Sequence, residues 1–430
     1  MLWLMQEHFE NGPANMDSAG IRQHHLLGLQ MHKKYLLRDE PFLNQTNLHN
    51  QLKVMVSDKG RTTISGSSYI QAFLENVKQL QNLKPRQINS LRQINRGMPK
   101  IKIHNRILEE AEKLENILPG NFQPIYLQSF LQSEKDQINL FSCKLLKDME
   151  AYLQTYQSEF LFWKDVHRHF KTMGIYDKMA ESVDMPLNKF YGLGFHNAYY
   201  VSCGLLAMRD IHPPDHHILS KFNYSDWDQI ERVWMTHQIG VWNKWVFDVK
   251  NTRVFKFLLN KTDSKIECIM QEINIDLYQY RNSGIDSDLC QNQEQYFIAF
   301  SHDSDLQPIA FLFDLEQQWE LGAYAGIFII ELHLEEEKLN KGDCVDPNVL
   351  INSNHLEKSS DDCFHVKVYF NEKQLFSELA YCDYKTKKCP YSKFKRDLMS
   401  KLMIDEIDST EICYEPFTTD RHRRHRVHLM

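Results

Sequence analysis

The sequence lacks a long hydrophobic run. None of its 430 residues fall in an apolar stretch of about 18 or more, the length needed for a transmembrane helix. It also lacks an excess of basic residues, and its formal net charge of −7 argues against general nucleic-acid binding, which needs a basic surface. The basic segment 420–428 is short, and we expect it to be a solvated tail.

Several motifs that carry chemistry are also missing. There is no GxGxxG, no P-loop and no GxSxG, so nucleotide-binding and serine-hydrolase functions have no support. No CxxC pair occurs among the nine cysteines, which weakens a zinc site, and the first residues contain no basic leader typical of a secretory signal. Four cysteines between Cys363 and Cys413 favour disulfides and an oxidising compartment.

What is present is a globular chain with 42% hydrophobic and 25% charged residues, long enough for an α/β core and a second lobe. Its most informative stretch is Tyr296–Leu306. The apolar run Tyr296–Phe300 predicts a buried strand, and it leads directly into Ser301, His302 and Asp303. Because ligands of open α/β sheets bind at the carboxyl ends of the strands, His302 and Asp303 are candidates for binding an anion and delivering a proton. The alternative is a solvated loop after a core strand.

A second stretch has the same plan of strand, polar turn and helix. Leu52–Val56 predicts a strand, the polar residues 57–66 predict a turn, and helical periodicity follows. Arg61 lies where this helix is expected to begin, and a guanidinium with backbone N–H groups suits a phosphate or another oxyanion. The alternative for a single arginine is a surface or salt-bridged side chain.

The remaining pattern is mainly helical. We expect an amphipathic helix at 17–37 capped by Asp17 or Ser18, helices without strands over 76–225, aromatic-rich helices at 226–260 and an irregular segment at 261–295. Strands are expected at 325–334 and 364–370, and further helices at 306–315 and 391–403. Histidines at two places lack the spacing of metal ligands and are expected to lie in surface loops: His167 and His169, then His212, His216 and His217.

Five segments, in the same order along the chain, resemble those of the histidine acid phosphatase family. They are 16–35, similar to the family's LTxxGxxQ helix; Ser57-Asp58-x-x-Arg61-Thr62-x-x-Ser65, similar to TDxDRTxxSA but with Gly60 in place of the second Asp; Ser301-His302-Asp303, similar to the HD motif; 328–332, similar to the strand ending in FEL; and a tail with Cys382, Cys389 and Cys413. The loop between the paired cysteines is longer than is usual in the family, and the resemblance leaves the pairing in this chain open.

The resemblance implies hydrolysis of phosphomonoesters without a cofactor or a metal. In the family, a histidine of an N-terminal RHGxRxP motif attacks phosphorus, arginines and the HD histidine hold the phosphoryl oxygens, and the HD aspartate protonates the leaving alcohol. Carried over by position, Arg61 and His302 would bind phosphate and Asp303 would be the general acid. The implied partner is a phosphorylated small molecule, and the implied location is secreted, lysosomal or vacuolar.

The RHGxRxP motif is missing, since the pair His-Gly occurs nowhere in the sequence and no arginine lies before Met16. Two explanations stay open. In the first, which we favour, the start of the sequence is truncated and the full-length form is an active phosphatase. In the second, the protein is an inactive relative that serves as a binding or scaffold module, because loss of a covalent nucleophile usually abolishes turnover. A third hypothesis, a helical interaction protein, fits the ordered motifs less well.

The sequence therefore predicts an α/β fold. We expect a mostly parallel sheet with helices on both faces, an inserted all-α cap and no counterpart of the family's first strand. The core is assigned to residues 1–75 and 226–430 and the cap to 76–225. The sequence does not indicate an oligomeric state or the identity of the substrate.

Overall fold

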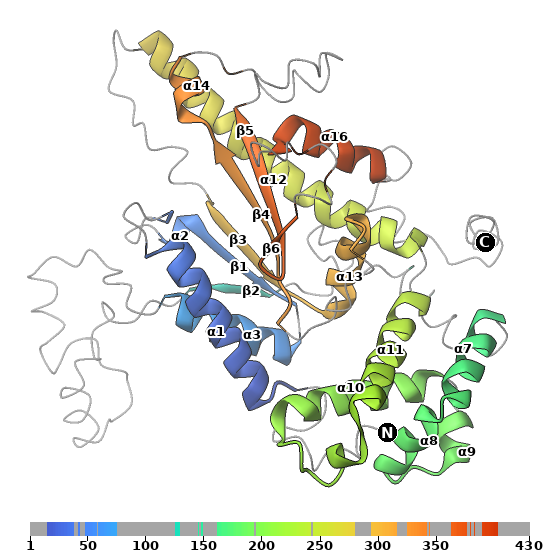
Figure 1. Cartoon of the computed structure of the whole chain (residues 1–430). Coiled ribbons are helices and arrows are strands. Elements are labelled where there is room, and N and C mark those ends of the chain that lie inside the picture. Colours follow the sequence, from blue (N-terminus) through green and yellow to red (C-terminus); the bar gives the residue numbers. More distant parts are fainter. Residues whose placement is uncertain are drawn as a thin grey trace, which may run out of the picture. The chain divides into compact units, whose positions relative to one another are not determined.

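The structure is a computed structural model of the whole chain (Figure 1). It describes the following residues: 15–37, 42–43, 48–57, 59–74, 125–129, 145, 148, 161–192, 195–241, 244–279, 294–315, 325–341, 344, 363–375, 379, 382 and 389–402. The chain forms two compact units: unit 1 is Met1–Gly20, Phe130–Met270 and Ser301–Met430, and unit 2 is Ile21–Ser129 and Gln271–Phe300.

Unit 2 is organised around a parallel sheet with strand order β2-β1-β3 (Figure 1). Its elements are α1 (Ser18–Tyr35), which begins in unit 1, α2 (Leu48–Gln51), β1 (Leu52–Val56), α3 (Gly60–Phe73), β2 (Leu127–Ser129) and β3 (Tyr296–Phe300). β1 is the middle strand, and four of its five residues are buried, as expected for a parallel strand covered on both faces. The bounds predicted for β1 and β3 are confirmed, but the prediction that β3 is a buried strand is wrong for four of its residues, because only Phe300 is buried.

The two longer helices of unit 2 pack closely on each other. A Cβ atom at Gly28 of α1 would come within 2.3 Å of the carbonyl oxygen of Tyr69 in α3, so only glycine fits at this crossing. Asp17 caps α1, because its Oδ1 accepts a hydrogen bond from the backbone N–H of Gly20 at 2.7 Å, which confirms one of the two expected caps. Tyr69 also hydrogen-bonds the hydroxyl of Tyr296 in β3 at 2.8 Å, so α3 is tied to the sheet as well.

Unit 1 contains most of the helices and an antiparallel sheet. Its elements are α7 (Leu161–Thr172), α8 (Ile175–Ser182), α9 (Leu187–Gly192), α10 (Phe195–Ile211), η4 (Leu219–Lys221), α11 (Tyr224–Val241), α12 (Lys244–Gln279, whose end belongs to unit 2), α13 (Asp303–Leu312), β4 (Phe328–Leu334), α14 (Glu336–Asn340), β5 (Phe364–Phe370), β6 (Lys373–Gln374), β7 (Cys389–Pro390) and α16 (Tyr391–Lys401). β5 pairs with β4, β6 and β7. Every second residue of β5 is buried, which agrees with the predicted alternation. One continuous hydrophobic core joins the helices of this unit to the sheet.

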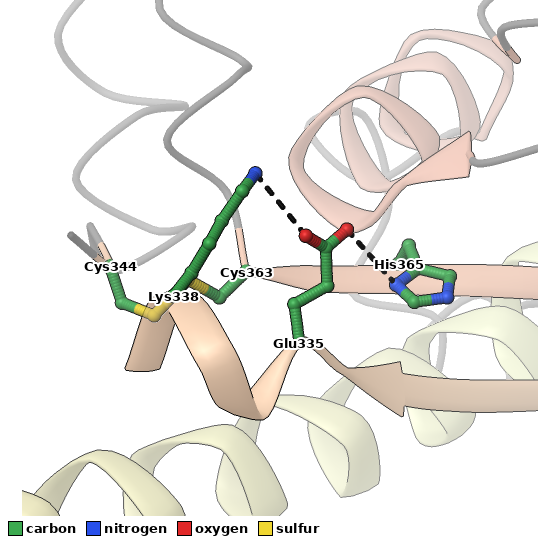
Figure 2. Close-up of a disulfide and its surroundings, with 5 residues drawn as sticks. All are labelled: Glu335, Lys338, Cys344, Cys363 and His365. Atoms are coloured by element: carbon green, nitrogen blue, oxygen red, sulfur yellow. Dashed lines mark ion pairs between the residues drawn. A yellow bond between two sulfur atoms is a disulfide. The ribbon is translucent and has the colours of Figure 1, made fainter. Parts of the chain in front are cut away.

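Two disulfides fix the chain around the antiparallel sheet. Cys344 pairs with Cys363, the residue before β5, and Cys382 pairs with Cys389 of β7. Figure 2 shows Glu335 beside the first disulfide, between Lys338 and His365, with Nζ–Oε2 and Nδ1–Oε1 distances of 3.4 and 4.0 Å. Disulfides in the cysteine-rich tail are therefore confirmed for Cys363, Cys382 and Cys389, and Cys413 lies outside the described residues.

Three predictions about elements need comment. The α/β class is confirmed. The segment 261–295 is not irregular throughout, because α12 continues to Gln279. β2 lies in the range 76–225, where the sequence predicts no strand; this strand has only three residues and is held by pairing with β1, which local periodicity does not reveal. The described part of that range after residue 160 is helical, and the proposed boundaries of core and cap stay a prediction. None of the helices in the described ranges is both long and apolar enough to cross a bilayer.

Candidate functional site

The first turn of interest, residues 57–62, joins β1 to α3. Thr62, the third residue of α3, reaches back to the end of the strand: its Oγ1 lies 2.8 Å from Ser57 Oγ, and it donates to the carbonyl oxygens of Ser57 and Lys59 at 2.9 and 2.8 Å. Ser57 and Thr62 are both buried. This neutral hydroxyl network fixes the backbone at the start of α3. Arg61 is the second residue of the helix, at the helix start where the sequence predicts it, and its side chain is partly exposed.

The second turn, residues 301–305, joins β3 to α13 and has the same plan. Asp305, the third residue of α13, reaches back to the residue that follows the strand, and its Oδ2 accepts a hydrogen bond from Ser301 Oγ at 2.5 Å. The same oxygen accepts from the backbone N–H of His302 at 3.2 Å. The other oxygen, Oδ1, lies 3.4 Å from Lys250 Nζ of α12. A buried carboxylate therefore takes the place that a threonine hydroxyl has in the first turn.

The electrostatics of the second turn follow from this burial. Loss of hydration raises the pKa of the Asp305 carboxyl, whereas Lys250, Ser301 and the His302 N–H act in the opposite direction. The net shift is upward. Asp305 is thus a carboxyl group whose charge is tolerated because three donors surround it, and removal of any donor would disfavour the ionised form further.

Asp303 is the first residue of α13, and its charge acts on two residues of α10. Burial raises the pKa of the Cys203 thiol and of the Tyr199 hydroxyl, and the carboxylate of Asp303 raises both further, so Asp303 lies close to this pair. His302 adopts an extended backbone, with φ −121° and ψ 160°, directly before the helix. His302 and Asp303 are therefore held at a strand-to-helix boundary, as predicted, and each is partly exposed.

The two turns follow neighbouring parallel strands. β1 and β3 pair in register with Val56 opposite Phe300, and the backbone N–H of Ser57 donates to the carbonyl oxygen of Phe300 at 3.1 Å. The two strands thus end level at the same edge of the sheet. Arg61 belongs to unit 2, whereas His302 and Asp303 belong to unit 1, so the geometry of each turn is described on its own.

Sequence reasoning missed the side chains that hold these turns. Thr62 and Asp305 are both the third residue of their helices, and each binds a serine that directly follows a strand. A serine after the strand and a polar residue four or five positions later is the signal that could have identified the pair. No such signal points to Lys250, which is 55 residues before Asp305.

The histidines considered as metal ligands contribute no ligand cluster within the described part of the chain, where no group of three or more His, Cys, Asp or Glu side chains could hold a metal ion. His167 and His169 lie on α7 and not in a loop, which corrects the prediction; burial followed by the charge of Lys171 lowers the pKa of His167. His212, His216 and His217 follow α10; the rings of His212 and His216 stack at a centroid distance of 4.5 Å, and those of His216 and His217 are tilted at 4.4 Å.

Comparison with known proteins gives a likeness of fold. No protein-family model and no curated protein sequence matches this chain. Among solved structures, the phytase of Hafnia alvei in complex with tartrate has a TM-score of 0.51 at 10% identity, over 97% of this chain and 94% of that chain. The apo form of the Hafnia alvei phytase has a TM-score of 0.50 at 10% identity, over 94% of this chain and 89% of that chain. The α/β fold of this chain is therefore similar to that of a phytase, as the sequence resemblance predicts.

Proposed function

We propose that this protein is a phosphatase-like protein that binds a phosphomonoester, with Arg61 and His302 as ligands of the phosphoryl oxygens and Asp303 as the proton donor to the leaving alcohol. The observation that carries the proposal is the pair of level strand ends. β1 and β3 stop side by side, and each is followed by a fixed turn that bears the residues in question. The likeness in fold to a phytase that was solved with tartrate, an anion, supports it.

Each of these residue types suits its role. A guanidinium binds two oxygens of a phosphate at once and keeps its charge at any relevant pH. The first turn of a helix adds partial positive charge, which favours an anion at both turns. A carboxyl group at the second turn can deliver a proton to a departing alkoxide when it lies within hydrogen-bond reach of the leaving oxygen, and Asp303 is partly exposed at the start of α13, where a ligand can reach it.

Hydrolysis by the family's covalent route needs a histidine nucleophile in an RHGxRxP setting, and these 430 residues contain no His-Gly pair. The proposal therefore has two parts. A full-length form that carries the motif would hydrolyse phosphomonoesters through a phosphohistidine, without a cofactor or metal. The alternative is an inactive phosphatase-like binding or scaffold protein, which Gly60, in place of the family's aspartate, supports.

Binding can be tested on the protein as it stands. We expect inorganic phosphate to bind in isothermal titration calorimetry at pH 5–6, and tartrate to compete with it. Arg61→Ala and His302→Ala should each weaken binding by about ten-fold or more, as expected for loss of a charge-assisted hydrogen bond. Arg168→Ala is the matched control, because Arg168 is an exposed arginine of α7 that pairs with the exposed Asp165 at 3.0 Å.

Turnover separates the two forms of the proposal. Hydrolysis of an aryl phosphate at acid pH that Asp303→Asn and His302→Ala abolish would establish the enzyme. Phosphate binding without hydrolysis would establish the inactive binding protein for this chain. Absence of phosphate binding would overturn both forms of the proposal. Phosphate binding that Arg61→Ala and His302→Ala leave unchanged would also overturn them.

A further inference from the structure

The carboxylate of Asp305 connects the second turn to α12 through three contacts. Oδ2 accepts from Ser301 Oγ at 2.5 Å and from the His302 backbone N–H at 3.2 Å, and Oδ1 pairs with Lys250 Nζ at 3.4 Å. Asp305 and Lys250 are both buried, with side-chain exposures of 10% and 9%. Since Ser301 and His302 immediately precede Asp303, this one carboxylate fixes the backbone on which both candidate functional side chains are carried.

A second contact joins the same two helices one residue further along. Asn251, next to Lys250 in α12, donates from Nδ2 to the carbonyl oxygen of Pro308 in α13 at 2.7 Å. Figure 1 shows α13 beside the long helix α12, and both contacts come from the first third of that helix. Lys250 and Asn251 therefore attach the beginning of α13 to a helix of 36 residues, which makes the turn part of a rigid support rather than a separate loop.

Stability alone does not account for this arrangement. A buried ion pair gives little net stability, because the cost of removing two charges from water offsets their attraction, and a well-packed apolar pair would serve equally well. The first turn shows that a neutral threonine closes the same kind of strand-to-helix connection. What the carboxylate adds is geometry: it holds two donors on one oxygen and one cation on the other, and so sets the direction in which the chain leaves β3.

We propose that Asp305, anchored by Lys250, is the positioning residue of this site, which sets where the imidazole of His302 and the carboxyl of Asp303 lie. The inference rests on the proposed function for the identity of the ligand, an oxyanion. The contacts of Asp305 that position the turn do not depend on that function. Phosphoryl ligands and proton donors must be held within a fraction of an ångström to be effective, so a shift of the turn weakens binding even when every ligand is still present.

The test compares Asp305→Asn with a matched ion pair elsewhere in unit 1. Asp263 in α12 pairs with Lys395 of α16 at 2.7 Å and is likewise mostly buried, so Asp263→Asn removes a similar charge far along the chain from the turn. Two readouts are used: the affinity for inorganic phosphate, and the ¹³Cε1 resonance and pH titration of His302, assigned by its loss in His302→Ala. The second readout needs no ligand.

We expect Asp305→Asn to shift the His302 resonance and its titration and to weaken phosphate binding by about ten-fold, while Asp263→Asn changes neither. Ser301→Ala keeps the ion pair and removes one hydrogen bond to Oδ2 of Asp305. If Asp305→Asn does not fold, Ser301→Ala replaces it, and we expect smaller changes in the His302 resonance and in the phosphate affinity. Asp305→Glu, which keeps the charge, should restore part of the affinity.

The outcomes separate this inference from the proposed function. If the wild-type protein does not bind phosphate but Asp305→Asn and Ser301→Ala still shift His302, the positioning role stands and the proposed ligand is wrong. If phosphate binds and both variants leave the His302 resonance, its titration and the affinity unchanged, Asp305 has only a structural role and the inference is overturned.

Discussion

Thr62 and Asp305 occupy the same place in two turns of the same plan. Each is the third residue of a helix that follows a parallel strand, and each binds the serine directly after that strand. The first closes its turn with neutral hydroxyls, within six residues of chain. The second uses a buried carboxylate and a lysine 55 residues away. The comparison teaches that two turns of one plan are held by different means: among the described contacts, a local hydroxyl network closes the first turn, and a long-range ion pair supports the second.

The largest loss of stability is expected when Asp305, the third residue of α13, is removed. Asp305→Ala leaves Lys250 buried without its carboxylate and removes the acceptor of Ser301 and His302, so we expect it to lower the free energy of unfolding by about 3–5 kcal/mol. Urea denaturation followed by circular dichroism measures this. The control is Asp228→Ala, whose partner Arg232 is exposed, and a change within about 0.5 kcal/mol is expected there.

A double variant separates the unpaired charge from the lost packing. Lys250→Met with Asp305→Leu removes both charges together, and we expect it to recover most of the stability lost in Asp305→Ala, since apolar pairs replace buried ion pairs at little cost. A double variant as unstable as the single one would mean that the hydrogen bonds to Ser301 and His302, and not the ion pair, hold the turn.

The corresponding change in the first turn should be smaller. Thr62→Val keeps the shape but removes the hydroxyl that contacts Ser57 and Lys59, so we expect a loss of about 1–2 kcal/mol, the cost of buried acceptors without their donor. Thr63→Val is the matched control in the same helical turn, because the hydroxyl of Thr63 is exposed and its hydrogen bond to the Lys59 carbonyl oxygen is long, at 3.4 Å. A loss equal to that of Asp305→Ala would contradict the distinction between the two turns.

How far the sequence predicts these turns depends on how local their causes are. β1 and β3 have their predicted bounds because five apolar or mostly apolar residues followed by serine specify a strand and its end. Arg61, His302 and Asp303 are candidate site residues because they follow those strand ends, and their roles stay a prediction. β2 and the Lys250–Asp305 pair were not predicted, because both result from tertiary pairing between residues far apart in the sequence.

The two units should also respond to pH with opposite sign. In unit 2, His24 packs edge-on against Phe300, and its Nδ1 has no hydrogen-bond partner among the described residues; burial lowers its pKa to about 4. The unfolded chain then binds more protons below the ordinary pKa of 6.5, so this contribution to stability is lost as the pH falls from about 6.5 to 4. His24 is partly exposed, so solvent limits the effect to about 1–2 kcal/mol.

Asp305 acts in the other direction, because its raised pKa makes the folded state bind the proton more tightly. The contribution of Asp305 to the free energy of unfolding falls as the pH rises from the ordinary pKa of 3.8 to the raised pKa in the folded protein. His24→Leu should therefore flatten the loss of stability on acidification, and Lys250→Met with Asp305→Asn should steepen it. Urea midpoints measured from pH 4 to pH 7 give the slopes; identical slopes in wild type and both variants would refute the opposition.

The smallest effect is expected at Gly60, the first residue of α3 and the position where the sequence departs from the phosphatase pattern. A Cβ atom there would meet nothing within 4 Å, and the residue has no positive φ, so the glycine is not required by the fold. Gly60→Ala should raise the free energy of unfolding by about 0.5–1 kcal/mol, because alanine loses less backbone entropy in a helix. Gly28→Ala is the contrasting control and should destabilise, since its Cβ would clash with the Tyr69 carbonyl oxygen. A loss of stability in Gly60→Ala would show that the first turn, like the second, depends on a constraint beyond its local hydrogen bonds.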